Sequence, residues 1–233
     1  MNTGNNNAIT IGEIVANDFR AASVFKSNHI DFCCGGKKSL AEACLEKGIE
    51  PEKVESELNE LAAIPANSGQ DYKLWKTDFL CDYIVNTHHQ YVLKTLPDLL
   101  FYTQKIATVH GKHHPELTEV AALFAKINDE LLQHLKKEEE VLFPAIKSAF
   151  AHNDQKSKDT IVSEITRMVG EHEFAGGAMD AINTLTHHYS LPPDSCATYQ
   201  VTFKLLEQFE DDLHIHVHLE NNILYPNALK LTY

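Results

Sequence analysis

One pattern occurs twice in this chain and constrains its fold more than any other feature. His134 is followed four residues later by Glu138. His216 is followed at the same spacing by Glu220, and each copy then continues, two residues on, with an aliphatic residue, leucine, an aromatic residue and proline. Residues i and i+4 lie on one face of a helix, so each copy aims an imidazole and a carboxylate in one direction. Two such helices facing each other would form a metal site.

Isolated parts of this pattern would carry little weight. A single His/Glu pair at i and i+4 is more often a surface pair that stabilises a helix by about 0.2–0.5 kcal/mol. Two copies with the same tail favour metal binding instead. On the last helix, His214 and His218 are also four residues apart, but only His216 keeps the register of the repeat. His214 and His218 are therefore predicted to lie on other, solvated faces.

Helical periodicity extends from residue 77 to the end of the chain, and the sequence contains no convincing strand. Short turns rich in Gly, Pro, Asn and Asp divide this region into four long helices. Long helices with short connections are typical of an up-down-up-down four-helix bundle, and hence of an all-α protein. The repeat falls on the second and fourth helices, which run parallel in such a bundle, so both copies lie at the same height. The expected helices cover residues 77–108, 116–150, 157–186 and 195–229.

The first 64 residues form a smaller helical pattern. Residues 1–8 are expected to be a frayed tail, capping boxes at Thr10 and Ser39 begin two helical segments, and Pro51 opens another. A stretch containing Pro, Asn and Gly then separates this unit from the long helices. The predicted parts are a small helical N-terminal domain, a linker and the four-helix bundle, at residues 1–64, 65–76 and 77–233.

Composition disfavours several classes of partner. The net charge of −13 repels phosphate backbones and anionic lipid surfaces, so neither nucleic acid nor membrane is an expected partner. No apolar run approaches the ~18 residues of a membrane span, and the N-terminus lacks the basic and apolar regions of a signal peptide. Five cysteines, an odd number, do not indicate a disulfide framework. A reducing, cytoplasmic location is therefore expected.

A dinuclear metal site needs more donors than the repeat supplies, and the other two long helices offer histidines. The third carries His172 well inside the bundle. The first carries His88 and His89, which point about 100° apart on a helix, and periodicity alone does not choose between them. Imidazole and carboxylate together suit Fe, Mn or Zn. Two such ions could be joined by the carboxylates and a solvent-derived oxygen.

Residues 30–37, Ile-Asp-Phe-Cys-Cys-Gly-Gly-Lys, resemble the N-terminal domain of the RIC (repair of iron centres) di-iron proteins. The four helices with their His/Glu pattern resemble a hemerythrin-like domain, and together the two resemblances cover almost the whole chain. The family has one histidine on each of the first and third helices, and its spacing selects His89 over His88. The resemblance implies an oxo- and carboxylate-bridged centre of two Fe ions, with the ligands His89, His134, Glu138, His172, His216 and Glu220.

Cys33 and Cys34 form a second group of interest. Neighbouring cysteines seldom form a stable disulfide, because the small ring strains the backbone. From the residues alone, a pair of buried apolar thiols is as good an interpretation as a functional pair. The family resemblance implies a redox or iron-transfer role. The remaining cysteines have no partner pattern and are expected to be packing residues: Cys44, Cys81 and Cys196.

Several glutamates lie close to the expected ligands. Glu130 precedes His134 by one helical turn, and Glu171 directly precedes the histidine of the third helix. Both match carboxylates that the family has near its site. There they would either hydrogen-bond the metal ligands or bind iron transiently as it enters or leaves. An ordinary surface charge is the equal alternative for each. Glu139 and Glu140 are expected to be solvated.

The family resemblance implies a stress-response function, the repair of iron–sulfur clusters damaged by nitrosative or oxidative stress, with iron donation as the route. Damaged iron–sulfur proteins are then the expected partners. The same centre could instead reduce nitric oxide or peroxide as an enzyme, or bind dioxygen or nitric oxide as a sensor. The absence of an evident fifth histidine argues against an oxygen carrier. The sequence leaves open whether the small domain docks on its own bundle or on that of a second copy in a homodimer.

Overall fold

The protein is described here by a computed structural model that covers residues 9–64 and 71–233. The expected tail over residues 1–8 and the linker stretch over residues 65–70 lie outside the described residues. Within the described ranges every regular element is helical, and the one pairing of the strand type is an isolated antiparallel bridge between Thr10 and Ser39. The predicted all-α fold class is confirmed.

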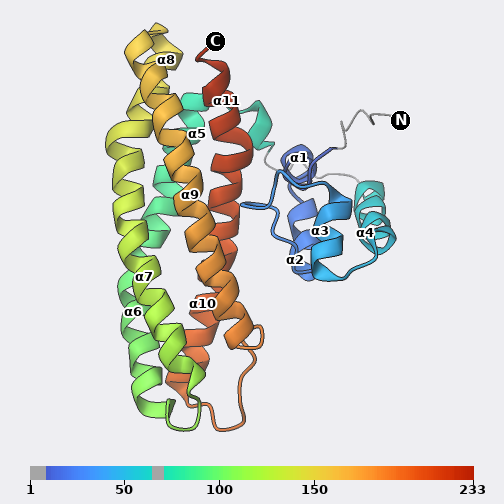
Figure 1. Ribbon diagram of the computed structural model, residues 1–233, viewed down its shortest axis with the longest axis vertical. Coiled ribbons are helices and arrows are strands. Elements are labelled where there is room, and N and C mark those ends of the chain that lie inside the picture. Colours follow the sequence, from blue (N-terminus) through green and yellow to red (C-terminus); the bar gives the residue numbers. More distant parts are fainter. Residues whose placement is uncertain (1–8, 65–70) are drawn as a thin grey trace, which may run out of the picture.

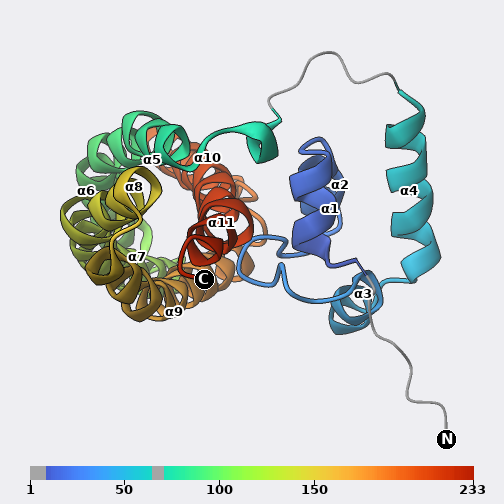
Figure 2. The same ribbon diagram turned by 90° about the horizontal axis from the view of Figure 1, so that it is seen from above.

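Four long helical rods form the bundle, which stands upright in Figure 1 and is seen end-on as a ring in Figure 2. The rods begin and end within two residues of the predicted helices. The first consists of α5 (Thr77–Ile84), η2 (Val85–His89) and α6 (Gln90–His110), and the second of α7 (Glu116–Lys137), η3 (Glu138–Leu142) and α8 (Phe143–His152). The third is α9 (Gln155–Leu185), and the fourth consists of α10 (Ala197–Leu219), η4 (Glu220–Leu224) and α11 (Tyr225–Lys230).

The elements η2, η3 and η4 are π-helical turns inside otherwise α-helical rods. Each of them contains one of the expected ligands, and π-helical turns are often found at functional sites. In the two copies of the repeat, the turn begins at the glutamate and ends just before Phe143 or Tyr225. The next residue is the proline of the repeat, whose missing N–H cannot close an α-helical bond back into the turn. The proline therefore favours the wider turn that carries the glutamate.

The small N-terminal domain contains α1 (Ile11–Asn17), α2 (Ala21–Ser27), α3 (Leu40–Lys47) and α4 (Pro51–Ala63). Both expected capping boxes form at the starts of α1 and α3, and Gly48 ends α3 in the left-handed region with a φ of 65°. Figure 2 places α1 and α2 between the bundle and α4. A 3₁₀ turn, η1 (Tyr72–Leu74), leads from this domain into the bundle.

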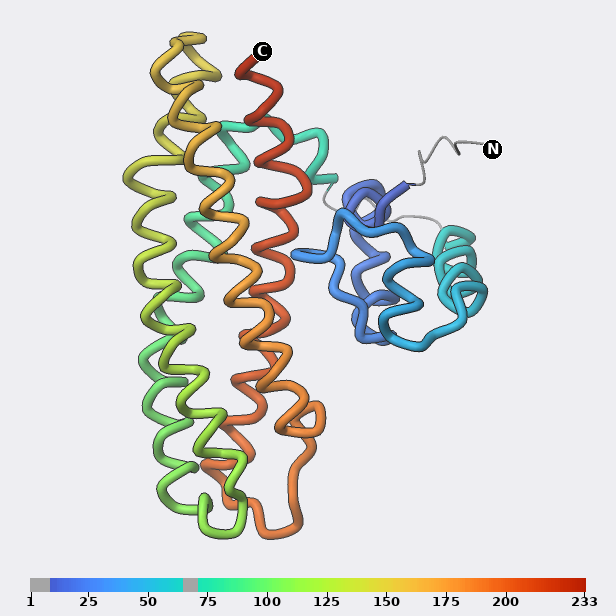
Figure 3. Tube along the Cα trace, viewed as in Figure 1, coloured from blue at the N-terminus to red at the C-terminus, as the bar shows by residue number. Residues whose placement is uncertain are grey.

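The loop between α2 and α3 docks against the side of the bundle, as the trace in Figure 3 shows. Asn222 of η4 donates from Nδ2 to the backbone carbonyls of Phe32 and Cys33, at 3.2 and 3.3 Å. Gly36 is needed because a Cβ there would lie 2.5 Å from Asn222 Oδ1. The small domain thus packs on the bundle of its own chain. In the part of the chain that the structure describes, no helix combines the length and apolarity needed to cross a membrane.

Candidate metal centre

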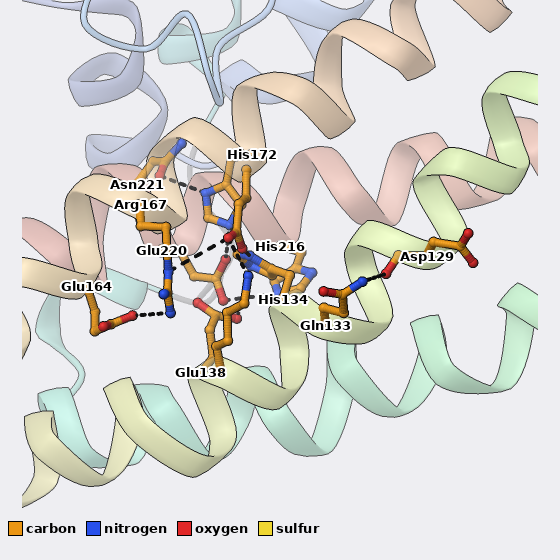
Figure 4. Close-up of polar contacts among 12 residues, drawn as sticks. Asp129, Gln133, His134, Glu138, Glu164, Arg167, His172, His216, Glu220 and Asn221 are labelled. Atoms are coloured by element: carbon orange, nitrogen blue, oxygen red, sulfur yellow. Dashed lines mark hydrogen bonds and ion pairs between the residues drawn. The ribbon is translucent and has the colours of Figure 1, made fainter.

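Six side chains from all four rods meet in one buried volume of the bundle, and five of them are labelled in Figure 4. They divide into two groups of four, in which the donor atoms lie within 4.8 Å of one another. Both groups contain Glu138 and Glu220, which are fully buried. Each group adds two histidines of its own. The groups are His89, His216, Glu138 and Glu220, and His134, His172, Glu138 and Glu220.

The two glutamates lie between the two pairs of histidines. Glu138 Oε2 is 3.3 Å from Nε2 of both His89 and His134. Glu220 Oε1 is 3.0 Å from Nε2 of His216, and Glu220 Oε2 is 3.1 Å from Nε2 of His172. Each carboxylate therefore reaches one histidine from each pair.

Outer hydrogen bonds orient three of the four imidazoles. In each case Nδ1 lies within 2.9 Å of a carboxylate or amide oxygen, so Nδ1 must carry the proton and donate it. That leaves the lone pair on Nε2, the atom that faces the centre. Such support fixes the ring and raises its basicity as a ligand. The pairs are His89 with Glu139, His134 with Glu171, and His172 with Asn221.

The buried polar atoms of the centre lack the partners that protein interiors normally supply. His89 Nε2, Glu138 Oε2 and Glu220 Oε2 are inaccessible to solvent, and apart from the ion-pair contacts given above they have no well-aligned hydrogen bond within the described residues. Nε2 of His134 lies 3.0 Å from Nε2 of His172, although the outer bonds leave a lone pair on each. Two lone pairs at this distance repel, so either a proton lies between the two nitrogens or metal ions take up the lone pairs. The donor set therefore fits a pair of metal ions.

Electrostatics in the centre favour positive charge. Burial and the charge of Glu220 oppose ionisation of Glu138, but His134 outweighs them and lowers the pKa of Glu138 to about 2. Burial likewise opposes protonation of His134 and His89, yet the buried carboxylates raise the pKa of both rings to about 10. Two carboxylates thus remain charged in a volume sealed from solvent. Protons on the rings or metal ions must balance them.

The aromatic residue of each repeat packs on a ligand. Phe143 stacks on His89 with ring centroids 5.6 Å apart, and Tyr225 stacks on His172 at 5.9 Å. Tyr225 also donates from Oη to Glu138 Oε1 at 2.5 Å. The sequence shows that each repeat has an aromatic residue. It did not predict that this residue would pack against a candidate ligand on a neighbouring helix.

The acidic neighbours differ from their sequence-based interpretation. Glu171 accepts a bond from His134, as its position suggested, and a second from Lys137 Nζ at 2.5 Å. Glu130 lies on the exposed side of α7, and no contact between it and the centre is found among the described residues. Glu139, expected to be solvated, instead binds His89.

The neighbouring histidines also require a correction. His218 was predicted to be solvated, but it is fully buried beneath the docked N-terminal domain, where its ring packs against Phe32. Burial lowers its pKa to about 4. His214 is half-buried at the same interface. His88 is buried outside the two ligand groups, and its Nδ1 lies 2.9 Å from Asp212 Oδ1.

The cysteine pair lies beside the centre. Cys34 Sγ is 3.4 Å from the backbone carbonyl of His172, and the two sulfurs are 3.9 Å apart without a disulfide. Asp31 Oδ1 accepts bonds from the backbone N–H groups of Cys33 and Cys34, at 2.9 and 3.0 Å. The Cys34 bond and burial raise the pKa of the Cys33 thiol. Of the other cysteines, Cys196 is exposed rather than packed, and lies 3.2 Å from His110 Nε2.

Comparison with known proteins agrees with this geometry. Residues 82–228 match the hemerythrin HHE cation-binding domain, and residues 7–62 match ScdA_N, a domain of unknown function. The iron-sulfur cluster repair protein YtfE of Enterobacter sp. (strain 638) is 31% identical over 219 residues, which cover 94% of this chain and 96% of the relative. This chain belongs to the family of iron-sulfur cluster repair proteins. The repair protein ScdA of Staphylococcus epidermidis (strain ATCC 12228) is 30% identical over 216 residues, covering 92% of this chain and 95% of the relative.

Proposed function

We propose that this protein holds two iron ions and uses them to repair iron–sulfur clusters damaged by nitrosative or oxidative stress, acting as an iron donor in the cytoplasm. The family supports the repair function, because the relatives named above are iron-sulfur cluster repair proteins. The mixed imidazole and carboxylate donors support iron as the metal. The observation that carries the donor route is the contact of Cys34 Sγ with the backbone carbonyl of His172.

The proposed ligands divide between two ions. His89 and His216 would bind one ion, His134 and His172 would bind the other, and Glu138 and Glu220 would bridge them. When bound, the iron pair supplies exchangeable iron and open coordination positions for nitric oxide or dioxygen. The chain holds the imidazoles in place through their Nδ1 bonds and keeps water away by burying the donors. Six ligands for two ions leave the metals incompletely enclosed, which favours release.

The cysteine pair is suited to receive a leaving ion. Cys34 Sγ lies against the helix that carries His172, and Asp31, Cys33 and Cys34 together offer a second group of donors within 4.8 Å. The raised pKa keeps the Cys33 thiol protonated until a metal arrives. Thiolates are strong iron ligands, and metal binding releases the thiol proton. The loop is held by its own chain, so a homodimer is not required for this contact.

Anaerobic transfer of iron to an apo iron–sulfur protein tests this proposal. The iron-loaded wild type should restore the cluster, with a rate followed by the cluster absorbance. A Cys33→Ala/Cys34→Ala variant should keep its iron but transfer it more than about tenfold more slowly, as loss of a directly participating ligand implies. Cys196→Ser is the matched control and should transfer at the wild-type rate.

Two outcomes would contradict the proposal in different ways. If the iron-loaded wild type restores no cluster, the donor function is wrong. If the double cysteine variant transfers as fast as the wild type, the function stands but the cysteine route is wrong. Sustained consumption of nitric oxide or peroxide over many turnovers would favour a reductase instead.

A further inference from the structure

A third group of side chains with metal-donor atoms lies away from the centre, in a cavity between the two domains. The cavity has a volume of about 220 Å³. Lys26, Asp31 and Phe32 line it from the N-terminal domain, and residues of α9 and α10 line it from the bundle. Figure 2 shows the N-terminal domain standing against α10 and α9, the two helices that provide the bundle wall of this cavity. The cavity therefore exists only while the two domains are docked.

Three donors of different kinds converge in this cavity. Glu210 and His214 are separated by one turn of α10, and Asp180 faces them from α9. One donor atom of each residue lies within 4.8 Å of the other two. Around a transition-metal ion with bonds of about 2.2 Å, donor atoms lie at most ~4.4 Å apart, so small side-chain rotations would close the group on an ion. The mixture of imidazole and carboxylates distinguishes it from an ordinary acidic patch.

Two buried residues, Glu210 and Tyr189, lie beside this donor group. Glu210 is only 6% exposed, and one of its oxygens accepts a bond from Asn183 Nδ2 at 2.9 Å. Burial raises the pKa of Glu210, because a charged carboxylate there lacks solvent. Tyr189 is 9% exposed and lines the same cavity, and its buried hydroxyl makes no well-aligned hydrogen bond within the described residues, although Glu210 and Asn183 lie close enough to affect its pKa. A metal ion would neutralise Glu210, and a water molecule on that ion would give the Tyr189 hydroxyl a partner.

The charges around the cavity favour a cation over an anion. Lys26 forms an ion pair with Asp211 at 2.5 Å, so its charge is already balanced. Lys47 is the other lysine among the lining residues. Against these two cations, the lining contributes four carboxylates: Asp31, Asp180, Glu207 and Glu210.

We propose that Asp180, Glu210 and His214 bind one divalent first-row transition-metal ion, in addition to the ions of the bundle centre. The site is bounded by Asp31 and Phe32, the residues that immediately precede the cysteine pair. An ion bound here would lie on the surface along which the two domains meet. The site does not depend on the repair function, because it is defined by metal binding alone.

Cobalt(II) binding to the full-length protein, with its centre already loaded with iron under anaerobic conditions, tests the proposal. Equilibrium dialysis should find one additional ion per chain in the wild type. Glu210→Gln and His214→Ala should each weaken that binding by more than about 100-fold, while Tyr189→Phe should weaken it by about tenfold or less, as for a residue that acts through a bound water. The iron content should stay unchanged in all three variants. Glu207→Gln, which removes a charge from the lining but not from the donor group, should bind as the wild type does.

The absorption spectrum of the bound cobalt identifies the donors. An ion held by imidazole and carboxylates has no thiolate-to-cobalt charge-transfer band, and this is the expected spectrum. If the only added ion shows that band, it is bound by a cysteine thiolate and the proposal is wrong. The proposal also fails if the wild type binds no added ion, or if Glu210→Gln and His214→Ala both bind as tightly as the wild type. Should Glu210→Gln fold poorly, the half-buried His214→Ala variant decides the question alone.

Discussion

The two halves of the proposed metal centre have equivalent candidate ligands but unequal surroundings. In the His134–His172 half, both rings have an outer partner for Nδ1. In the His89–His216 half, His89 has such a partner, but His216 Nδ1 is buried without one. The cysteine loop touches only the first of these halves among its described contacts, through the carbonyl of His172. The sequence repeat makes the halves look alike, whereas residues outside the repeat make them different.

The carboxylates that hydrogen-bond Nδ1 of His134 and His89 also differ between the two halves. Glu171 is held by Lys137 as well as by its histidine, and its side chain is 16% exposed. Glu139 serves His89 from the edge of η3, with a side chain that is 37% exposed. Hydrogen bonds to a ligand strengthen metal binding, and they do so more when solvent competes less. We therefore expect the His134–His172 half to hold its ion more tightly.

The largest effect on iron binding is expected from the two carboxylates that both halves share. Replacing both shared carboxylates, Glu138→Ala with Glu220→Ala, should abolish binding at both halves, because each proposed ion loses two ligands at once. Metal analysis of the purified variant should find no bound iron. The matched control is Glu130→Ala with Glu140→Ala. This double variant removes two exposed carboxylates from the rod that carries Glu138, and it should leave the iron content unchanged. Retention of iron in the first variant would rule out the shared-carboxylate arrangement.

The next largest effect on iron binding is expected to differ between the two halves. Glu171→Gln should weaken iron binding by about 10–100-fold, the range for an outer partner of a ligand. The hydrogen bond from His134 lowers the pKa of Glu171 to about 2, so the native carboxylate is charged at neutral pH and glutamine removes that charge. Glu139→Gln, the matched change in the other half, should have a smaller effect. Iron release to a chelator, measured for both variants, provides the comparison, and equal release rates would remove the proposed inequality.

Helix periodicity, a local property, brought together four of the six candidate ligands in the sequence, and the family resemblance supplied the choice of His89. The i, i+4 spacing placed His134 with Glu138, and the register of the repeat chose His216 over its neighbours. Contacts between a helix of the bundle and the N-terminal domain were not predicted. His218 lies on a face that would be solvated in an isolated bundle, and only the docked N-terminal domain buries it.

The π-helical turns account for another part of what the sequence did not predict. In a regular α-helix Glu139 would point away from the ligand face. A π-helical turn holds more residues per turn than an α-helix and so changes the direction of the side chains within it. Glu139 lies in η3 and reaches His89, and Asn221 lies in η4 and reaches His172. The glutamate-to-proline spacing of the repeat is the signal that could have indicated both turns.

A smaller effect concerns the one hydroxyl that breaks the symmetry of the repeat. Tyr225 donates to Glu138, while Phe143, its counterpart in the first copy, has no group to donate. Tyr225→Phe makes the two copies alike and leaves a buried carboxylate oxygen without its donor. A hydrogen bond to a charged group contributes about 1.5–3 kcal/mol. We expect the free energy of unfolding of the metal-loaded variant to be lower by that amount. Its unfolding midpoint should therefore fall to a lower denaturant concentration. An unchanged unfolding midpoint would mean that the Tyr225 bond has no net effect on stability.

The smallest effect on metal binding is expected from the residue that joins the cysteine loop to the bundle. Asn222→Ala removes the donor that binds the carbonyls of Phe32 and Cys33, but it leaves every proposed ligand of the centre in place. The iron content should stay unchanged, while Cys34 becomes more accessible as the loop loosens from the His134–His172 half. Its rate of alkylation by a neutral thiol reagent, measured by mass spectrometry, should rise several-fold, because a lost neutral hydrogen bond of about 1 kcal/mol changes an opening equilibrium by about that factor. The exposed Cys196 serves as the internal control, and its rate should not change. If Cys34 reacts no faster, Asn222 does not hold the loop, and the contact between the cysteine pair and this half depends instead on the packing of Phe32 against His218.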